Sequence, residues 1–102
     1  MEVVLVRVVQ DFILSLDKAT LAKTLRIIDL LEKFGYALGM PHSKKILPKL
    51  FELRITGDKE IRIFYTLKSG NACLLHGFVK KTQKIPSNEI QKALNQMEKL
   101  DT

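Results

Sequence analysis

The sequence predicts a single α+β domain of 102 residues, and three features of the chain lead to this class. Apolar residues recur at helical spacing before residue 35, three short segments with strand character follow between residues 50 and 79, and a second helical repeat comes last. A hydrophobic content of 46% is enough for one core in a chain of this length, so residues 1–102 are expected to form one domain. We therefore predict an antiparallel sheet with N-terminal helices packed on one face and a C-terminal helix, which leaves the other face at least partly open.

The N-terminal third is predicted to contain a strand and two helices. Val3–Val9 is rich in β-branched residues and is expected to form a strand, followed by a short helical segment up to Leu16. Asp17 is a plausible N-cap for a longer helix that stops at Gly35. The apolar side of this helix is expected to consist of Leu21, Leu25, Ile28 and Leu31.

Three strands joined by short turns are predicted between residues 50 and 79. Leu50–Thr56 alternates between an apolar side and a side that carries Glu52 and Arg54. Ile61–Leu67 and Ala72–Val79 follow, each after a short turn that contains glycine. Together with the N-terminal strand, this three-strand meander makes up the predicted sheet.

The remaining segments are a connection and the last helix. Tyr36–Lys49 contains two prolines and is expected to be irregular. Ser87 is expected to cap a helix whose apolar stripe consists of Ile90, Leu94, Met97 and Leu100.

The basic excess of the chain is concentrated in its middle. The net charge is +6, yet residues 1–39 carry five basic and five acidic side chains, whereas residues 40–88 carry ten basic against three acidic ones. Concentrated positive charge favours a polyanionic partner such as nucleic acid, because binding releases counterions. No apolar run approaches the roughly 20 residues of a membrane-spanning helix, and the N-terminus lacks a secretory signal pattern. A cytoplasmic protein without membrane association is therefore expected, and the single cysteine, Cys73, is expected to be a small buried hydrophobe.

Arg54 and Arg62 are the first candidates for a functional site. Alternation places both on the polar side of neighbouring strands, away from the core, where two planar guanidiniums would form a phosphate site with many donors. The alternative is that each arginine only forms ion pairs with Glu52, Asp58 or Glu60 along the sheet surface.

A second group of candidates follows the last predicted strand. Lys80, Lys81 and Lys84 lie in a stretch without acidic residues between Glu60 and Glu89, so they lack ion-pair partners nearby in the sequence. Clustered ammonium groups favour loss of a proton from one of them, which would allow acid or base chemistry. The alternative is a solvated turn.

Tyr65 and His76 are weaker candidates. Strand alternation puts Tyr65 on the same face as Ile63, so Tyr65 is expected in the core. It also puts His76 on the same face as Leu74, and a hydrogen-bonded, partly buried histidine fits this position at least as well as a catalytic one. Neither His76 nor His42 has a second ligand at metal-binding spacing, so we expect no metal and no cofactor.

The familiar hydrolase and nucleotide-binding motifs are absent from the sequence. There is no nucleophile elbow, no Walker loop and no H-E-x-x-H pair. Metal-free RNA cleavage needs only a base for the 2′-hydroxyl, cations for the phosphorane and an acid for the leaving 5′-oxygen. Arginine and lysine side chains can supply all three.

Several segments resemble the phage-derived, Gp49-like branch of the RelE/HigB toxin superfamily. They are LFELRI (50–55), IRIFY (61–65), LLHGFVKKTQKIP (74–86) and DLLEKFGYALGMPHSK (29–44), and the resemblance covers nearly the whole chain. It implies a small RelE-like fold and the toxin of a type II toxin–antitoxin pair. Such a toxin would cleave mRNA on the ribosome and be neutralised by a helix-turn-helix, HigA-like antitoxin, through which alone it would reach operator DNA.

The resemblance also assigns roles to individual residues. Arg54 and Arg62 match basic strand residues that stabilise the scissile phosphate, and Lys81 matches the basic position after the last strand. The residues expected to hold the backbone of mRNA or rRNA are Lys44, Lys45, Lys49, Lys80 and Lys84. Glu52 stands where some members have a lysine proposed as base, and the last helix contains no Tyr or His, so the general base and acid stay open.

Two other functions fit the same resemblance. One is a non-enzymatic, ParE-like inhibitor of DNA gyrase, and the other is a degenerate toxin retained as an antitoxin-binding co-repressor. The intact group of Arg54, Arg62 and Lys81 argues against the gyrase inhibitor, whereas the missing Tyr or His in the last helix keeps that alternative open.

Overall fold

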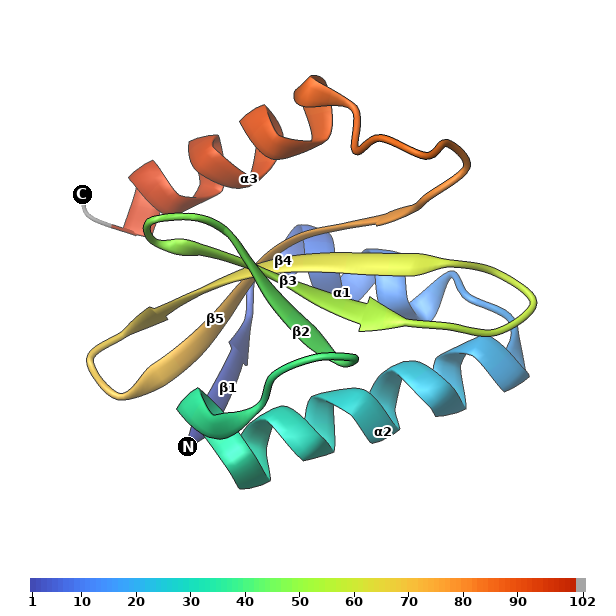
Figure 1. Cartoon of the computed structure of the whole chain (residues 1–102), viewed down its shortest axis with the longest axis horizontal. Helices are drawn as coiled ribbons and strands as arrows, with labels where there is room; N and C mark the ends of the chain where they lie inside the picture. The colour runs from blue at the N-terminus through green and yellow to red at the C-terminus, as the bar shows by residue number, and fades with distance from the viewer. Residues whose placement is uncertain (101–102) are drawn as a thin grey trace.

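The computed structural model describes residues 1–100, which form a five-stranded sheet and three α-helices (Figure 1). The elements in chain order are β1 (Glu2–Leu5), α1 (Arg7–Leu14), α2 (Lys18–Phe34), the 3₁₀ helix η1 (Gly35–Ala37), β2 (Ser43–Leu47), β3 (Leu50–Ile55), β4 (Ile61–Lys68), β5 (Asn71–Val79) and α3 (Ser87–Leu100). The predicted α+β class is confirmed. No helix within the described part of the chain combines the length and the apolar character that a membrane crossing requires.

Helices cover both faces of the sheet, as Figure 1 shows with α2 and α3 on opposite sides. One core cluster joins α1 and α2 to the sheet and contains Val9, Ile27 and Leu31. The second cluster lies under α3 and contains Phe64 and Ala93. The face of the sheet that was predicted to be at least partly open is therefore covered in part by the C-terminal helix.

The strand order is β1-β5-β4-β3-β2. The predicted meander of β3, β4 and β5 is antiparallel throughout, but β1 pairs with β5 in parallel. The prediction of an antiparallel sheet was thus wrong at this edge. Side-chain alternation reports which face a residue occupies and carries no information on the direction of a strand relative to a distant partner.

The N-terminal strand is shorter than predicted. It ends at Leu5, and the second half of the valine-rich segment forms the start of α1. Val9 and Ile13, one helical turn apart, are both buried against the sheet. Burial of these two side chains outweighs the strand preference of β-branched residues, because tertiary packing affects local structure more strongly than intrinsic propensity does.

The long helix α2 has the predicted ends, and three of its four predicted apolar residues, Leu21, Ile28 and Leu31, lie in or against the core. The carboxylate of Asp17 accepts a hydrogen bond from the Thr20 amide at 3.1 Å, and the helix stops at Gly35, whose φ of 52° suits a residue without Cβ. Leu25, expected in the core, is 48% exposed. The buried residues of the helix are Thr20, Thr24, Ile27, Ile28 and Leu31.

The segment predicted to be irregular contains an edge strand. β2 pairs antiparallel with β3, and the hydroxyl groups of Ser43 and Tyr65 form a buried hydrogen bond of 2.5 Å. Its two lysines and the following Pro48 gave it little strand character in the sequence, as is common for the edge of a sheet.

A β-bulge in β5 shifts the alternation of its side chains between the two faces of the sheet. Phe64 pairs with His76, whereas the next residue, Tyr65, pairs with Leu74, so Leu75 has no partner across the ladder. Leu74 therefore belongs to the core under α1 and α2, and Leu75 to the core under α3. The prediction that Leu74 and His76 share a face was wrong for this reason.

Candidate functional site

The strand register places the candidate arginines directly opposite each other. Arg54 on β3 pairs with Arg62 on β4, and Arg62 pairs with Phe78 on β5. The neighbouring row consists of Glu52, Phe64 and His76. Directly paired residues point to the same side of a sheet, so both rows lie on the face that α3 partly covers.

One carboxylate lies between the two arginines. Oε1 of Glu52 is 3.6 Å from Nε of Arg54 and 3.8 Å from Nε of Arg62. Arg62 also forms a 3.0 Å ion pair with Glu60 and donates to the carbonyl of Ile61 at 3.0 Å. Both arginines therefore take part in ion pairs on the sheet.

Arg62 is buried, contrary to the expectation that it avoids the core. Its side chain is 3% exposed, compared with 28% for Arg54. A buried guanidinium requires compensation, which the carboxylates of Glu52 and Glu60 provide. Nε of Arg62 and Oε2 of Glu52 are buried without a hydrogen-bond partner.

A hollow of about 340 Å³ lies at the end of β5, next to Arg62. The amide of Lys80 donates to the carbonyl of Glu60 at 2.7 Å, which fixes the chain after β5 against the start of β4. Arg62 and Lys81, predicted to act together, both line this hollow. Its complete lining is Glu60, Arg62, Lys80, Lys81, Thr82 and Gln83.

Arg54 lines a different hollow, on the side of α2. This second hollow measures about 390 Å³ and includes two basic side chains of the helix, Lys23 and Arg26. Sequence reasoning missed both residues. Their spacing of three residues on a helix was the available signal, since positions i and i+3 share one side.

The structure separates the lysines that were expected to bind RNA. Lys44 pairs with Glu52 and lies on the face of the arginines, whereas Lys45 pairs with Phe51 and lies on the opposite face. Lys49 lines a third hollow beside α3. Lys84 is exposed in the loop after Lys81, where its carbonyl accepts a hydrogen bond from Thr82 at 2.6 Å.

His76 and Tyr65 are both engaged in structural contacts. Nε2 of His76 lies 2.9 Å from Oε1 of Glu89, a contact that joins β5 to the first turn of α3. Tyr65 is 2% exposed and belongs to the core on the other face of the sheet. Burial raises the pKa of the Tyr65 phenol, which disfavours the phenolate that base chemistry would need.

The described residues do not bring together three or more His, Cys, Asp or Glu side chains that could hold a metal ion. The basic side chains that line the two hollows can instead bind phosphate groups. Lysine binds phosphate as a point charge, and arginine adds planar, multi-donor hydrogen bonding.

Comparison with known protein families identifies the chain. The family described as phage-derived protein Gp49-like (DUF891) matches residues 11–98, from α1 to nearly the end of α3. The chain belongs to this family. Gp49-like proteins are a family of RelE/HigB-type toxins, so the resemblance seen in the sequence is confirmed.

Membership also implies a partner of a definite kind, because toxins of toxin–antitoxin systems are paired with an antitoxin. A search of curated proteins gave no match to this chain.

Proposed function

We propose that this Gp49-like protein is a ribosome-dependent mRNA endonuclease that inhibits translation as the toxin of a type II toxin–antitoxin module. The observation that carries the proposal is the hollow in which Arg62, Lys80 and Lys81 meet, close to Arg54 on the neighbouring strand. Membership in a RelE/HigB-type toxin family supports the same function.

The reaction needs no metal ion. The 2′-hydroxyl loses a proton and attacks the adjacent phosphorus, a phosphorane forms, and the bond to the 5′-oxygen breaks as that oxygen takes up a proton. The products are a 2′,3′-cyclic phosphate and a free 5′-hydroxyl. Arg54 and Lys81, which are more exposed than Arg62, contact the phosphate, and the buried Arg62 stabilises the charge that develops on it.

We assign the proton transfers to Glu60 and to a lysine of the hollow. Glu60 is the carboxylate that lines the hollow, and its side chain is 38% exposed while Arg62 holds it at 3.0 Å. It accepts the proton of the 2′-hydroxyl, and Lys81 or Lys80 gives a proton to the leaving oxygen. This assignment fills the roles that the sequence left open.

The other lysines bind the nucleic acid backbone. Lys44, Lys80 and Lys84 hold mRNA or rRNA phosphates near the site, whereas Lys45 and Lys49 contact the ribosome from other sides of the molecule. A helix-turn-helix, HigA-like antitoxin neutralises the toxin in the cytoplasm and provides its contact with operator DNA.

Primer extension on cellular mRNA after induction tests the proposal. We expect discrete cuts in translated mRNA for the wild type, and a loss of about 10²-fold or more for Lys81→Ala and Arg54→Ala, since each removes a cation from the transition state. Lys18→Ala, which removes an exposed lysine from the start of α2, is the matched control and should cut like the wild type.

Arg62→Ala is expected to abolish growth inhibition, and retained binding of the antitoxin would show that this variant is folded. Intact mRNA together with DNA breaks would identify a gyrase inhibitor instead. A complex with antitoxin but no toxicity from the wild type would identify a degenerate toxin. Either result would overturn the proposal.

A further inference from the structure

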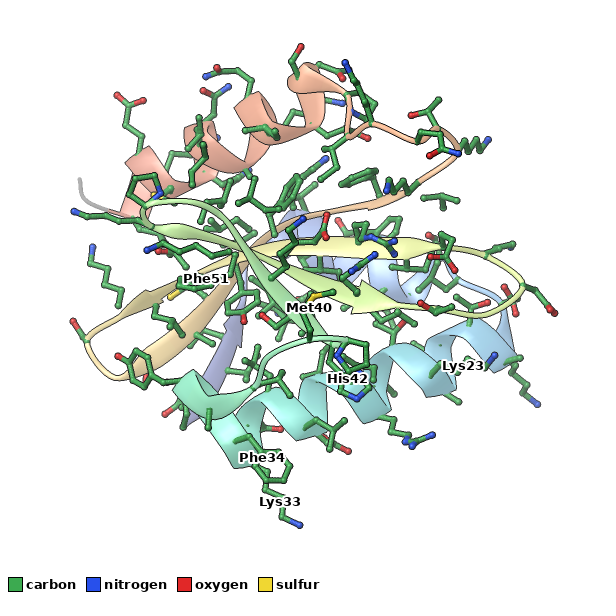
Figure 2. All side chains as sticks on the ribbon, viewed as in Figure 1. Lys23, Lys33, Phe34, Met40, His42 and Phe51 are labelled. Carbon is green, nitrogen blue, oxygen red and sulfur yellow. The ribbon has the colours of Figure 1, made fainter. Side chains whose placement is uncertain are left out.

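The second hollow, between α2 and the end of β3, is a separate basic site. It measures about 390 Å³, within the range of small-molecule sites. Its lining consists of Lys23, Arg26, Ile27, Pro41, His42, Arg54, Ile55 and Thr56, without an acidic residue. Figure 2 shows His42 beside α2, the helix that carries Lys23.

The two helix cations in this hollow have no compensating partner. Lys23 and Arg26 make no hydrogen bond or ion pair within residues 1–100, unlike Arg62 in the first hollow. A Cβ at Gly57 would lie 2.6 Å from Nζ of Lys23, so the ammonium rests directly over the backbone of this glycine. The hollow therefore keeps positive charge available for an anion.

Arg54 adds donors on the opposite wall. Its Nε lies 3.6 Å from Glu52, while Nη1 has, within residues 1–100, only the sulfur of Met40 as a partner, at 3.6 Å. A thioether is a weak acceptor, and an anionic oxygen would replace it with a stronger hydrogen bond. Three cations thus approach one space from two elements.

Most of the rest of the lining consists of apolar side chains and rings. Ile27 and Ile55 are buried at the base of the hollow, and Pro41 and the imidazole of His42 form its outer part. A free phosphate would leave this apolar surface unused. A ligand that combines a phosphate with a planar heterocycle would contact both parts, and bases stack well on imidazole and similar side chains.

We propose that this hollow binds one nucleotide, with the phosphate on Lys23, Arg26 and Arg54 and the base against Ile27, Pro41 and His42. The nucleotide is either a unit of an RNA strand or a free mononucleotide. The RNA source rests on the proposed endonuclease function, since Arg54 would then connect the bound nucleotide to the scissile phosphate. The free mononucleotide does not depend on that function.

Calorimetric titration of the purified full chain tests this site. The ligands are adenosine and uridine 5′-monophosphate, the nucleosides without phosphate, inorganic phosphate, and a trinucleotide RNA with 2′-O-methyl groups that prevent cleavage. We expect the nucleotides to bind more tightly than the nucleosides or phosphate alone. The Lys23→Ala/Arg26→Ala double variant should bind them at least about tenfold more weakly, since charge-assisted contacts are lost.

Two further variants make the test specific. Lys33→Ala removes an exposed lysine from the other end of the same helix, away from His42 and Lys23 in Figure 2, and should change the affinity by less than about twofold. Gly57→Ala keeps all charges, yet its Cβ displaces Nζ of Lys23 and should weaken binding. Both helix substitutions lie at exposed positions, and circular dichroism verifies the fold.

The source of the nucleotide follows from the same samples. Tighter binding of the trinucleotide, with a raised KM for mRNA cleavage in the double variant when translating ribosomes are added, identifies an RNA subsite. Equal affinity for mononucleotide and trinucleotide, with an unchanged KM, identifies a free nucleotide site. Both results support the proposal.

Equal affinities of wild type and double variant would overturn the nucleotide site, as would absence of nucleotide binding at millimolar concentration. The same holds if the wild type binds no nucleotide and the double variant loses affinity for an acidic segment of the antitoxin. Failure of the endonuclease function would give a different result: the wild type would still bind nucleotide but would not cleave mRNA on translating ribosomes.

Discussion

Oε1 of Glu52 lies 3.8 Å from Nε of Arg62, and both side chains are at least 96% buried. The same oxygen is 3.6 Å from Arg54, which faces Arg62 across the ladder. Like charges directly opposite each other destabilise a sheet. Glu52 thus allows two guanidiniums to occupy neighbouring strands at the centre of the candidate site.

Replacing Glu52 with alanine is expected to destabilise the fold strongly. The change leaves the buried Arg62 with Glu60 as its ion-pair partner and removes the carboxylate that it shares with Arg54. Breaking a buried ion pair by removing one partner costs about 3–5 kcal/mol. Urea unfolding measures this loss, and Glu98→Ala, at an exposed position on α3, should stay within about 0.5 kcal/mol. Equal stability of the two variants would show that Glu52 does not compensate the arginines.

Tyr65→Phe is expected to lower stability without affecting RNA cleavage. It leaves the hydroxyl of the buried Ser43 without its 2.5 Å partner, at a cost of about 1–3 kcal/mol. Cleavage should persist, because Tyr65 lies on the face away from the arginines and burial keeps its pKa above the ordinary value. Tyr36→Phe, at a 74% exposed position, is the matched control. A loss of cleavage by folded Tyr65→Phe alone would give the phenol a catalytic role.

The contact of His76 with Glu89 is expected to stabilise the attachment of α3. A double-mutant cycle with His76→Ala and Glu89→Ala should give a coupling free energy of about 0.5–3 kcal/mol, because the 2.9 Å contact is largely shielded from solvent. If His76 only joins β5 to α3, the cleavage rate of folded His76→Ala stays within a few-fold of the wild type. A loss of 10²-fold or more, the size expected for a general acid or base, would contradict the structural role.

The stability that Asp17 gives to the fold is expected to decrease at acidic pH. Hydrogen bonds from the hydroxyl and amide of Thr20, with the ammonium of Lys59, hold the pKa of Asp17 well below its ordinary 3.8. A depressed pKa in the folded state stabilises the fold above the unfolded pKa, and this contribution is lost as the pH falls below about 4.

Thermal unfolding of wild type and Asp17→Asn between pH 2.5 and 7 checks this effect. Asparagine also caps helices but cannot ionise, so the wild type should have the higher midpoint at pH 7, and the difference should shrink below about pH 4. Asp29→Asn, at an exposed position on the same helix, serves as the control. A difference that stays constant over this range would exclude the charge of Asp17 as its cause.

The sequence predicted elements with a strong local signal. The helix that starts after Asp17, the meander strands and the apolar stripe of α3 all appear near their predicted positions, because repeating patterns of burial create them. β2 and the first half of α1 were missed. An edge strand between prolines and a short valine-rich helix have weak or misleading local patterns, and pairing or packing with distant segments decides their structure.

Within the candidate site, the sequence placed Arg54 and Arg62 on one face, and the register confirms that they are neighbours. The alternation of side chains along a strand could not show that Arg62 is buried. Its surroundings are the chain after β5, which lines the hollow beside it, and the carboxylates of Glu52 and Glu60, and only the folded sheet brings these groups together.

By itself, the sequence determined the α+β class, the family and the basic middle of the chain, because these follow from composition, local periodicity and motifs. Only the tertiary structure divided that charge into two hollows, one with Arg62 and Lys81 and the other with Arg54, Lys23 and Arg26. The division arises because α2 packs beside the end of β3, a contact between residues about thirty positions apart that no local pattern encodes.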